Sequence, residues 1–307
     1  MKKVVFLILI SLFLIWNCGQ DSKEAAASKE IKKEKPSVTV SILPQEYFVQ
    51  RIVGDKYKIN VMIPPGHSPA TYEPTPREMR AVSESILYFR IGFIAFEKAW
   101  MDKIASINKG MKIVDTSRGV TFIRGTPYPS HEASETKSLH HLDNRGIDPH
   151  IWLSPSAVKV QVKNILEAFM ETDPDTRVIY EENYQAFIQD IEQLQAENKA
   201  VLEPFRGRQF MVYHPAWSYF AREYGLIQFP IEIEGKSPSA ANLKKIIDLA
   251  KKENIHVIFV QQQFDANSAR AAAREIDGKV ITMDPLSPDW LNNMKKMALT
   301  FKEALTH

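Results

Sequence analysis

The sequence predicts an α/β protein of two lobes, each a mostly parallel sheet flanked by helices, joined by one long rigid helix. Short runs rich in β-branched residues alternate with helical patterns before residue 125 and again after residue 205. Between these two regions lies a long stretch with helical periodicity, 173–205. Hydrophobic residues make up 44% of the 307-residue chain, which is sufficient for a core in each of two domains.

Residues 1–18 are expected to be a signal or lipoprotein segment outside the fold. Two lysines precede an apolar run, residues 4–16, which is shorter than the roughly 20 residues that a membrane-spanning helix needs. Cys18 is the single cysteine, so neither an internal disulfide nor a multi-cysteine metal site is possible. Its place resembles the lipidation site of bacterial lipoproteins; Asn17 stands where a small residue is usual, and ordinary cleavage is the alternative. Residues 19–36 are polar and alanine-rich, which predicts a flexible tether.

The N-terminal lobe is predicted over 37–172. Strands are expected at 37–43, 57–63, 86–92 and 112–117, and helices at 45–54, 75–85, 95–107 and 154–172. Gly54 ends the first helix, and Pro76 falls in the first turn of the second, where its missing N–H costs nothing. Residues 125–149 show no periodicity and are predicted to form a long mobile loop.

The linking helix is predicted over 173–204, with Asp173 as N-cap and Pro174 in the first position. About 28 helical residues would reach roughly 40 Å, enough to span both lobes. Apolar residues recur at threes and fours, and they are expected to face the core: Val178, Ile179, Tyr184, Phe187, Ile188, Ile191, Leu194 and Val201.

The C-terminal lobe is predicted over 205–307. Strands are expected at 208–214, 226–233, 256–262 and 279–284, and helices at 216–225, 239–254, 266–277 and from 287 onward. The alternation implies right-handed crossovers and a mostly parallel sheet, as in the first lobe.

Four chemically active side chains fall in loops that can face one cleft. Ligands of open parallel sheets gather beyond the carboxyl ends of the strands. His67, His214 and Asp284 each follow or close a predicted strand, and His150 precedes a helix. His256 begins a strand, at the opposite end, and is predicted to be structural.

Three imidazoles and a carboxylate suit a divalent metal, above all Zn²⁺. A metal-binding imidazole needs a partner for its other nitrogen, and Asp148 and Glu73 are candidates for that role.

Several segments are more specific than this spacing. They are "SPATYEPTP" at 68–76, "DPHIWLSP" at 148–155, "YHPAWSYFAREYGL" at 213–226, "PSAANLKKIIDLAKKENIHVIFVQQQF" at 238–264 and "MDPLSPDWLNNM" at 283–294. The chain resembles, over roughly residues 38–305, the zinc/manganese substrate-binding proteins of bacterial ABC importers. The resemblance implies a high-affinity metal receptor outside the inner membrane that hands its ion to a permease. It also implies a His-rich mobile loop, here with His131, His140 and His141.

The resemblance assigns His150, His214 and Asp284 to metal-binding positions. Zinc-type members carry His at position 214 where manganese-type members carry Glu, so Zn²⁺ is favoured, with Mn²⁺ as the alternative. The ligand expected in the first loop is replaced by Ala70, three residues after His67. Either His67 reaches the same metal, or the ligand is lost and water, Glu73 or a histidine of the mobile loop takes its place.

The sequence therefore predicts an exported Zn²⁺ receptor without enzymatic turnover, periplasmic or at the cell surface, monomeric and anchored through a lipid on Cys18. Its net charge of +2 does not favour nucleic acid as a partner. Metal affinity is expected to fall as pH drops through the usual histidine range near 6.5, and the long helix predicts a small closure of the lobes. The alternatives are a manganese or iron receptor on the same scaffold, a zinc hydrolase and an adhesin. The chain has no HExxH motif, which counts against the hydrolase.

Overall fold

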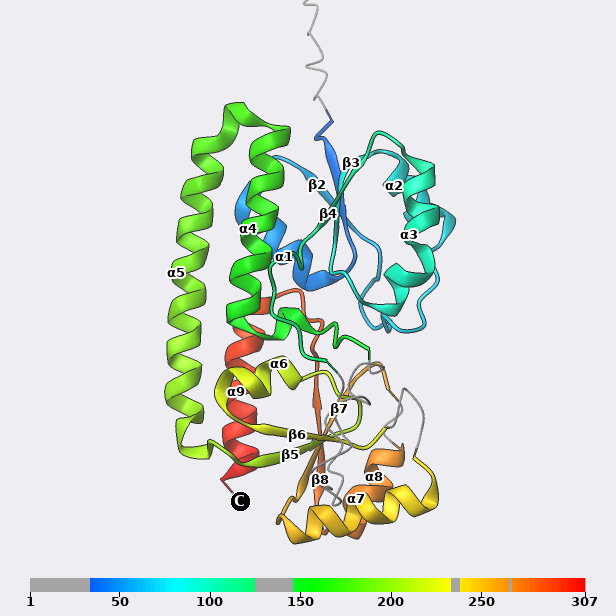
Figure 1. Cartoon of the computed structure of the whole chain (residues 1–307), viewed down its shortest axis with the longest axis vertical. Helices are drawn as coiled ribbons and strands as arrows, with labels where there is room; N and C mark the ends of the chain where they lie inside the picture. Colours follow the sequence, from blue (N-terminus) through cyan, green and yellow to red (C-terminus); the bar gives the residue numbers. More distant parts are fainter. Residues whose placement is uncertain (1–33, 125–145, 233–237, 265–266, 307) are drawn as a thin grey trace, which may run out of the picture. The chain divides into compact units, whose positions relative to one another are not determined.

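The first sheet consists of four parallel strands (Figure 1). The computed structural model describes residues 34–124, 146–232, 238–264 and 267–306. The strands lie in the order β2-β1-β3-β4 and are β1 (Ser37–Val40), β2 (Lys58–Val61), β3 (Ser85–Arg90) and β4 (Lys112–Asp115). The helices around them are α1 (Leu43–Val53), α2 (Pro76–Ser83), α3 (Ala95–Ile107) and α4 (Pro155–Thr172). Helices α2 and α3 cover one face, and α1 and α4 cover the other.

Local sequence explains where two of these helices begin. Thr75 and Glu78 form a capping box at the start of α2, in which each side chain bonds the backbone N–H of the other residue. At the start of α4, the Ser154 side chain accepts a hydrogen bond from the N–H of Ala157, and Pro155 occupies the first turn.

The second sheet repeats the arrangement of the first. Its strands lie in the order β6-β5-β7-β8, all parallel, and are β5 (Gln209–Val212), β6 (Ile227–Pro230), β7 (Val257–Gln261) and β8 (Lys279–Met283). The surrounding helices are α6 (Ser218–Tyr224), α7 (Ala240–Lys252), α8 (Asn267–Glu275) and α9 (Trp290–Leu305). The predicted fold class, two α/β lobes with mostly parallel sheets, is confirmed.

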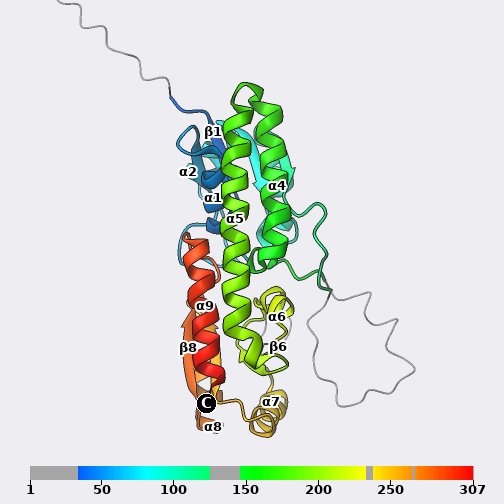
Figure 2. The ribbon, with the colours of Figure 1, turned by 90° about the vertical axis from the view of Figure 1, so that its left-hand side faces the viewer.

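Helix α5 (Arg177–Leu202) joins the two lobes. It packs against α1 and α4 of the first lobe and against α9 of the second, as Figure 2 shows. Its 26 residues correspond to about 39 Å at 1.5 Å per residue. Both lobes and this helix belong to one compact unit, residues 35–307.

The beginning of α5 differs from the prediction. A 3₁₀ turn, Pro174–Thr176, precedes the helix, and Asp173 does not cap it, because its carboxylate accepts a hydrogen bond from the Tyr180 hydroxyl at 2.6 Å. The expectation that Val178 and Ile179 face the core is also wrong, since these side chains are 68% and 56% exposed. Tyr180 in the same turn is buried, so Val178 and Ile179 lie off the face of α5 that packs against its neighbours.

Aromatic side chains hold the junction between the lobes. Phe48 of α1, Phe187 of α5 and Trp290 of α9 are all buried. The Trp290 ring meets Phe48 at 5.3 Å and Phe187 at 6.3 Å, both edge to face. Because these three residues come from the first lobe, the linking helix and the second lobe, one core runs through the junction.

Candidate metal centre

Two of the predicted ligands meet at the junction between the lobes. His150 lies just before a 3₁₀ turn, Ile151–Leu153, and His214 follows β5 by two residues. Their Nε2 atoms are 3.4 Å apart, and the rings meet at a steep angle. One histidine comes from each lobe.

Each of these histidines has a carboxylate on its other nitrogen. Nδ1 of His150 lies 2.8 Å from Oδ1 of Asp148, and Nδ1 of His214 lies 2.5 Å from Oε1 of Glu232. A carboxylate accepts hydrogen bonds and has no proton to donate, so each neutral ring carries its proton on Nδ1. Both Nε2 lone pairs then face one another with no proton between them, an arrangement that a cation can satisfy.

The spacing of the pair fits zinc. Two nitrogen ligands at about 2.0–2.1 Å from a tetrahedral Zn²⁺ are about 3.3–3.4 Å apart, which matches the observed distance between the Nε2 atoms. The rings are also restrained: Phe264 stacks on His214 at 4.9 Å, and His150 contacts Trp152 at 5.2 Å. Trp152 is itself fixed, because its Nε1–H donates to the carbonyl of Pro285 at 2.7 Å.

A cavity of about 250 Å³ adjoins the histidine pair. Loops after five strands contribute to it: Ser68–Ala70 after β2, Phe93–Ala95 after β3, His214 after β5, Gln263 and Phe264 after β7, and Pro285 and Leu286 after β8. The carboxyl ends of strands from both sheets therefore meet here, as expected for a ligand site of parallel sheets.

The structure does not bring His67 to this pair. Among the described residues, Ala70 lines the cavity, and His67 does not. The His67 side chain is exposed, with Nδ1 at 3.2 Å from the carbonyl of Pro65 and its ring against Tyr72. Glu73 is exposed as well, so it does not orient either of the paired imidazoles.

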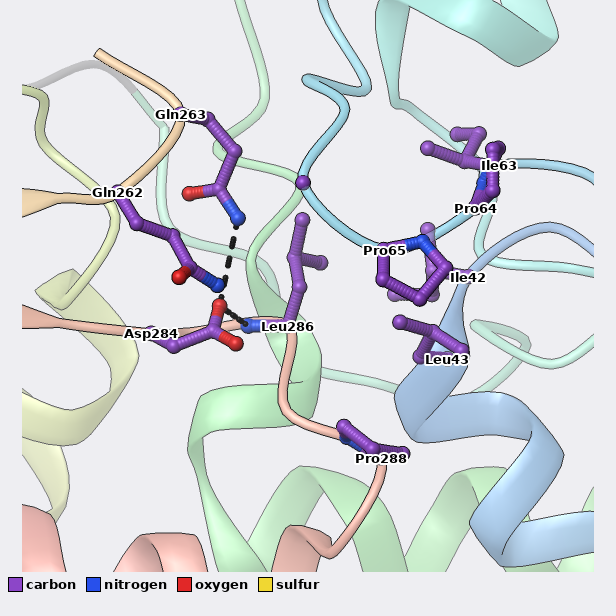
Figure 3. A pocket seen from close by; sticks show the side chains of 11 residues that line it. Ile42, Leu43, Ile63, Pro64, Pro65, Gln262, Gln263, Asp284, Leu286 and Pro288 are labelled. Carbon is purple, nitrogen blue, oxygen red and sulfur yellow. Dashed lines mark hydrogen bonds between the residues drawn. The ribbon is translucent and has the colours of Figure 1, made fainter. Parts of the chain in front are cut away.

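Asp284 occupies a separate, smaller pocket of about 40 Å³, between its loop and that of Pro65 (Figure 3). Its Oδ1 accepts hydrogen bonds from the N–H of Leu286 at 2.9 Å and from Nε2 of Gln263 at 3.3 Å. Gln263 lines both pockets and so stands between Asp284 and the histidine pair. In the part of the chain that the structure describes, no three His, Cys, Asp or Glu side chains gather closely enough to hold a metal.

A buried carboxylate supports the wall of the cavity. Glu97, in the first turn of α3, accepts hydrogen bonds from the N–H groups of Ile91 and Gly92, both at 2.7 Å, and from the Ser41 hydroxyl at 2.5 Å. Burial raises the pKa of Glu97 to about 7, although these hydrogen bonds oppose the shift. The carboxyl group thereby fixes the loop that carries Phe93 into the cavity.

Comparison with known proteins identifies the family. The sequence profile described as zinc-uptake complex component A, periplasmic (ZnuA), matches residues 38–304. The chain belongs to the ZnuA family. The resemblance predicted from the sequence is confirmed, and the members of this family are substrate-binding proteins.

Individual ZnuA-family proteins are similar over most of the chain. The high-affinity zinc uptake system protein ZnuA of Bacillus subtilis (strain 168) is 29% identical over 286 residues, with 92% of this chain and 88% of that protein covered. Zinc-binding protein AdcA of Streptococcus pyogenes serotype M3 (strain ATCC BAA-595 / MGAS315) is 25% identical over 305 residues, with 93% of this chain but 56% of AdcA covered.

Solved structures agree with this assignment. A crystal structure of ZnuA is 40% identical, with a TM-score of 0.80, 89% of this chain covered and 100% of that chain. The structure of a ZnuA deletion mutant with zinc bound is 40% identical, with a TM-score of 0.79, 88% of this chain covered and 98% of that chain.

Glu232 is a residue of this candidate site that was not predicted from the sequence. Its N–H donates to the carbonyl of Tyr213 at 3.0 Å, which continues the parallel pairing of β5 with β6 beyond the ends of the strands. The signal was the register of the two strands, because a carboxylate that follows β6 lies beside the histidine that follows β5.

The remaining predicted residues lie outside the described part of the chain: His131, His140 and His141 of the predicted loop, and Cys18. None of the helices in the described part of the chain has the length and apolar character needed to cross a membrane.

Proposed function

We propose that this ZnuA-family chain is an extracytoplasmic receptor that binds Zn²⁺ with His150 and His214 and delivers it to the permease of an ABC importer. The observation that carries the proposal is the facing pair of Nε2 atoms, 3.4 Å apart, with a carboxylate on each Nδ1. Two neutral imidazoles favour Zn²⁺ over Mn²⁺, which prefers carboxylate, carbonyl and water oxygens.

We propose Asp284 as the third ligand. The next residues along the chain, Pro285 and Leu286, already line the cavity beside the histidine pair. To bind the metal, the Asp284 carboxylate would give up its hydrogen bond from Gln263. His67 is proposed as the fourth ligand, after a movement of its loop. Water, Glu73 or one of the histidines at 131, 140 and 141 is the alternative at that position.

The proposed receptor carries out no chemical turnover. A zinc hydrolase needs a general base beside the metal-bound water. The two carboxylates nearest to the histidine pair, Asp148 and Glu232, are already engaged by the Nδ1 atoms. Hydrolysis of a test ester by the purified chain that disappears in Asp284→Ala would contradict this part of the proposal.

We also propose that the protein is a monomer anchored to the membrane by a lipid on Cys18. The position of this cysteine after the apolar N-terminal run supports the anchor. Detergent phase partition of the full chain from its host cells tests it: Cys18→Ser is expected to move to the aqueous phase, whereas an anchor-free wild type would be there already.

Competition titration with Zn²⁺ and Mn²⁺ tests the metal site. His150→Ala and His214→Ala are expected to weaken zinc binding by more than about 100-fold, beyond the loss usual for an outer partner. His256→Ala is the matched control, since its ring bonds the carbonyl of Ile276 at 3.0 Å and Asn254 at 3.1 Å at the amino end of β7. Unchanged zinc affinity in either alanine variant of the pair would refute the site, and equal affinity for both metals would refute the selectivity.

A further inference from the structure

One buried hydroxyl connects the two halves of the histidine pair. Tyr219, in the first turn of α6, is fully buried. Its oxygen accepts a hydrogen bond from the N–H of Ile123 at 3.0 Å and donates one to the carbonyl of Asp148 at 2.8 Å. Burial raises the pKa of Tyr219 to about 12, so the hydroxyl keeps the proton that it donates.

Asp148, whose carbonyl accepts this hydrogen bond, is also the residue that orients His150. Oδ1 of Asp148 accepts from Nδ1 of His150 at 2.8 Å and from the His150 backbone N–H at 2.9 Å. The N–H of Asp148 also donates to the carbonyl of Ile123 at 3.0 Å. Tyr219 thus bonds both segments of this small antiparallel pairing, and a shift of Asp148 moves the imidazole of His150 with it.

The donor helix is fixed with respect to His214. The N–H of Ala216 donates to the carbonyl of His214 at 2.9 Å, so the chain turns directly from the ligand into α6. Gln228 of β6 is buried and holds that turn, because its side chain bonds the N–H of Trp217 at 2.8 Å and the Ser218 hydroxyl at 2.9 Å. Tyr219 is therefore held in a fixed position relative to His214 by this hydrogen-bonded turn.

Arg222 strengthens this connection from the surface. Its guanidinium lies 5.0 Å from the centre of the Tyr219 ring and donates to the carbonyl of Thr121 at 3.1 Å. Two side chains one turn apart on α6 consequently hold the segment 121–123, and with it the partner segment that begins the His150 loop.

We propose that Tyr219 is a positioning residue of the zinc site, whose hydroxyl sets the separation between the Nε2 atoms of His150 and His214. The inference rests on the zinc site proposed above. The separation matters because each Zn–N bond is only about 2 Å long, so a small displacement of one imidazole takes it out of range. Loss of an outer partner of this kind typically weakens metal binding by about 10–100-fold.

Tyr219→Phe in the full chain, with Tyr224→Phe as the matched control, tests the proposal. Tyr224 lies on the same helix, is buried, and its hydroxyl accepts a hydrogen bond from Asn198 at 3.3 Å, away from the histidines. Tyr219→Phe is expected to weaken zinc binding by about 10–100-fold and to change the visible absorption of bound Co²⁺, a probe of ligand geometry. Tyr224→Phe is expected to stay within about twofold of the wild type, since it removes no partner of the metal site.

A double-mutant cycle separates positioning from general stability. If Tyr219 acts through His150, Tyr219→Phe has no further effect on zinc affinity in a His150→Ala background, whereas a merely structural effect would add. Should Tyr219→Phe fail to fold, Gln228→Met, which releases the α6 turn but keeps the hydroxyl, replaces it with the same expected loss.

Zinc binding of Tyr219→Phe at the wild-type level, an equal loss in Tyr224→Phe, or additive effects in the cycle would each overturn the inference while leaving the metal site intact. A wild-type chain that binds no zinc, or a His150→Ala variant that binds normally, would instead refute the proposed function itself.

Discussion

At the residue scale, the carboxylates Asp148 and Glu232 orient the two imidazoles of the candidate site. Asp148 and Glu232 each bond one Nδ1 and leave Nε2 available to the proposed metal. A charged partner also makes the imidazole a stronger electron donor. Glu232 is only 4% exposed, so its charge acts on His214 with little screening by water.

Glu232→Gln is expected to weaken zinc binding by about 10-fold or more, the lower end of the range for an outer partner. The amide keeps a hydrogen-bond acceptor for Nδ1 of His214 but removes the negative charge. Competition with a coloured zinc chelator measures the change. Glu253→Gln, which alters a carboxylate bonded to Gln209 away from the histidines, is the control, and a loss of equal size there would count against the argument.

His150 and His214 could be placed from the sequence because each stands in a loop at the end of a strand or before a helix, where ligands of parallel sheets gather. Glu232 could not, since it is 18 residues from His214 and reaches it only through the pairing of β5 with β6. The place of His67 depends on the path of its loop, in which Ala70 lines the cavity and the imidazole packs on Tyr72. Hydrophobic periodicity does not indicate which residue of such a loop faces the cavity.

At the element scale, the start of α3 combines a tight loop with a buried charge. Gly92 has φ of +118°, and a side chain there would meet the Ser117 hydroxyl at 2.8 Å. The loop can therefore turn closely over Glu97, whose carboxylate receives the N–H groups of Ile91 and Gly92. The carboxyl group replaces the hydrogen bonds that water would otherwise make to this backbone.

Stability should depend on pH through Glu97. Its folded pKa of about 7 is above the ordinary value of 4.5, so the folded state binds the proton more tightly. The resulting stabilisation is complete below pH 4.5 and is lost as pH rises through 7, by up to about 3 kcal/mol. Glu97→Gln, which cannot ionise, is therefore expected to gain stability relative to the wild type between pH 5 and pH 7.5.

Urea unfolding of both proteins at the two pH values measures this difference. Glu84→Gln, at an exposed glutamate in the same lobe, is the control and should show no such gain. A constant offset between Glu97→Gln and the wild type at both pH values would disprove the linkage.

The existence and order of the helices and strands followed from the sequence because their apolar periods are strong and Gly or Pro separates most of them. The start of α5 did not follow, because a preference for capping competes with tertiary contacts. Asp is a residue type favoured at N-caps, but the carboxylate of Asp173 bonds the Tyr180 hydroxyl and pairs with Lys56. Likewise, Val178 and Ile179 are apolar but lie off the buried face of α5, to which Tyr180 belongs.

At the scale of the whole molecule, many contacts join the lobes besides α5. Trp290 donates to the carbonyl of Trp152 at 2.7 Å, and Trp152 donates to the carbonyl of Pro285. Glu223 of α6 accepts from the Ser154 hydroxyl at 2.5 Å, at the first turn of α4. Wide hinge bending would break these hydrogen bonds, of which the two tryptophan bonds are buried, at a cost of about 1 kcal/mol or more each.

We therefore expect zinc to change the arrangement of the lobes only slightly. The radius of gyration measured by small-angle X-ray scattering should differ by less than about 1 Å between the metal-free and zinc-saturated chain, since closure around a rigid helix is limited to small sliding movements. The comparison requires that zinc occupancy is confirmed in the same sample. A larger contraction would show that α5 or its packing bends.

The division of the histidine pair between the lobes has a consequence for unloading. A Zn²⁺ ion bound to one imidazole from each lobe would link the two lobes across the junction. Moving one lobe away by about 1 Å would lengthen a Zn–N bond of about 2 Å by half. A transporter that docks on both lobes would not need to separate them widely to release the ion. A slight rotation of one lobe relative to the other, about the rigid helix α5, would be sufficient for release.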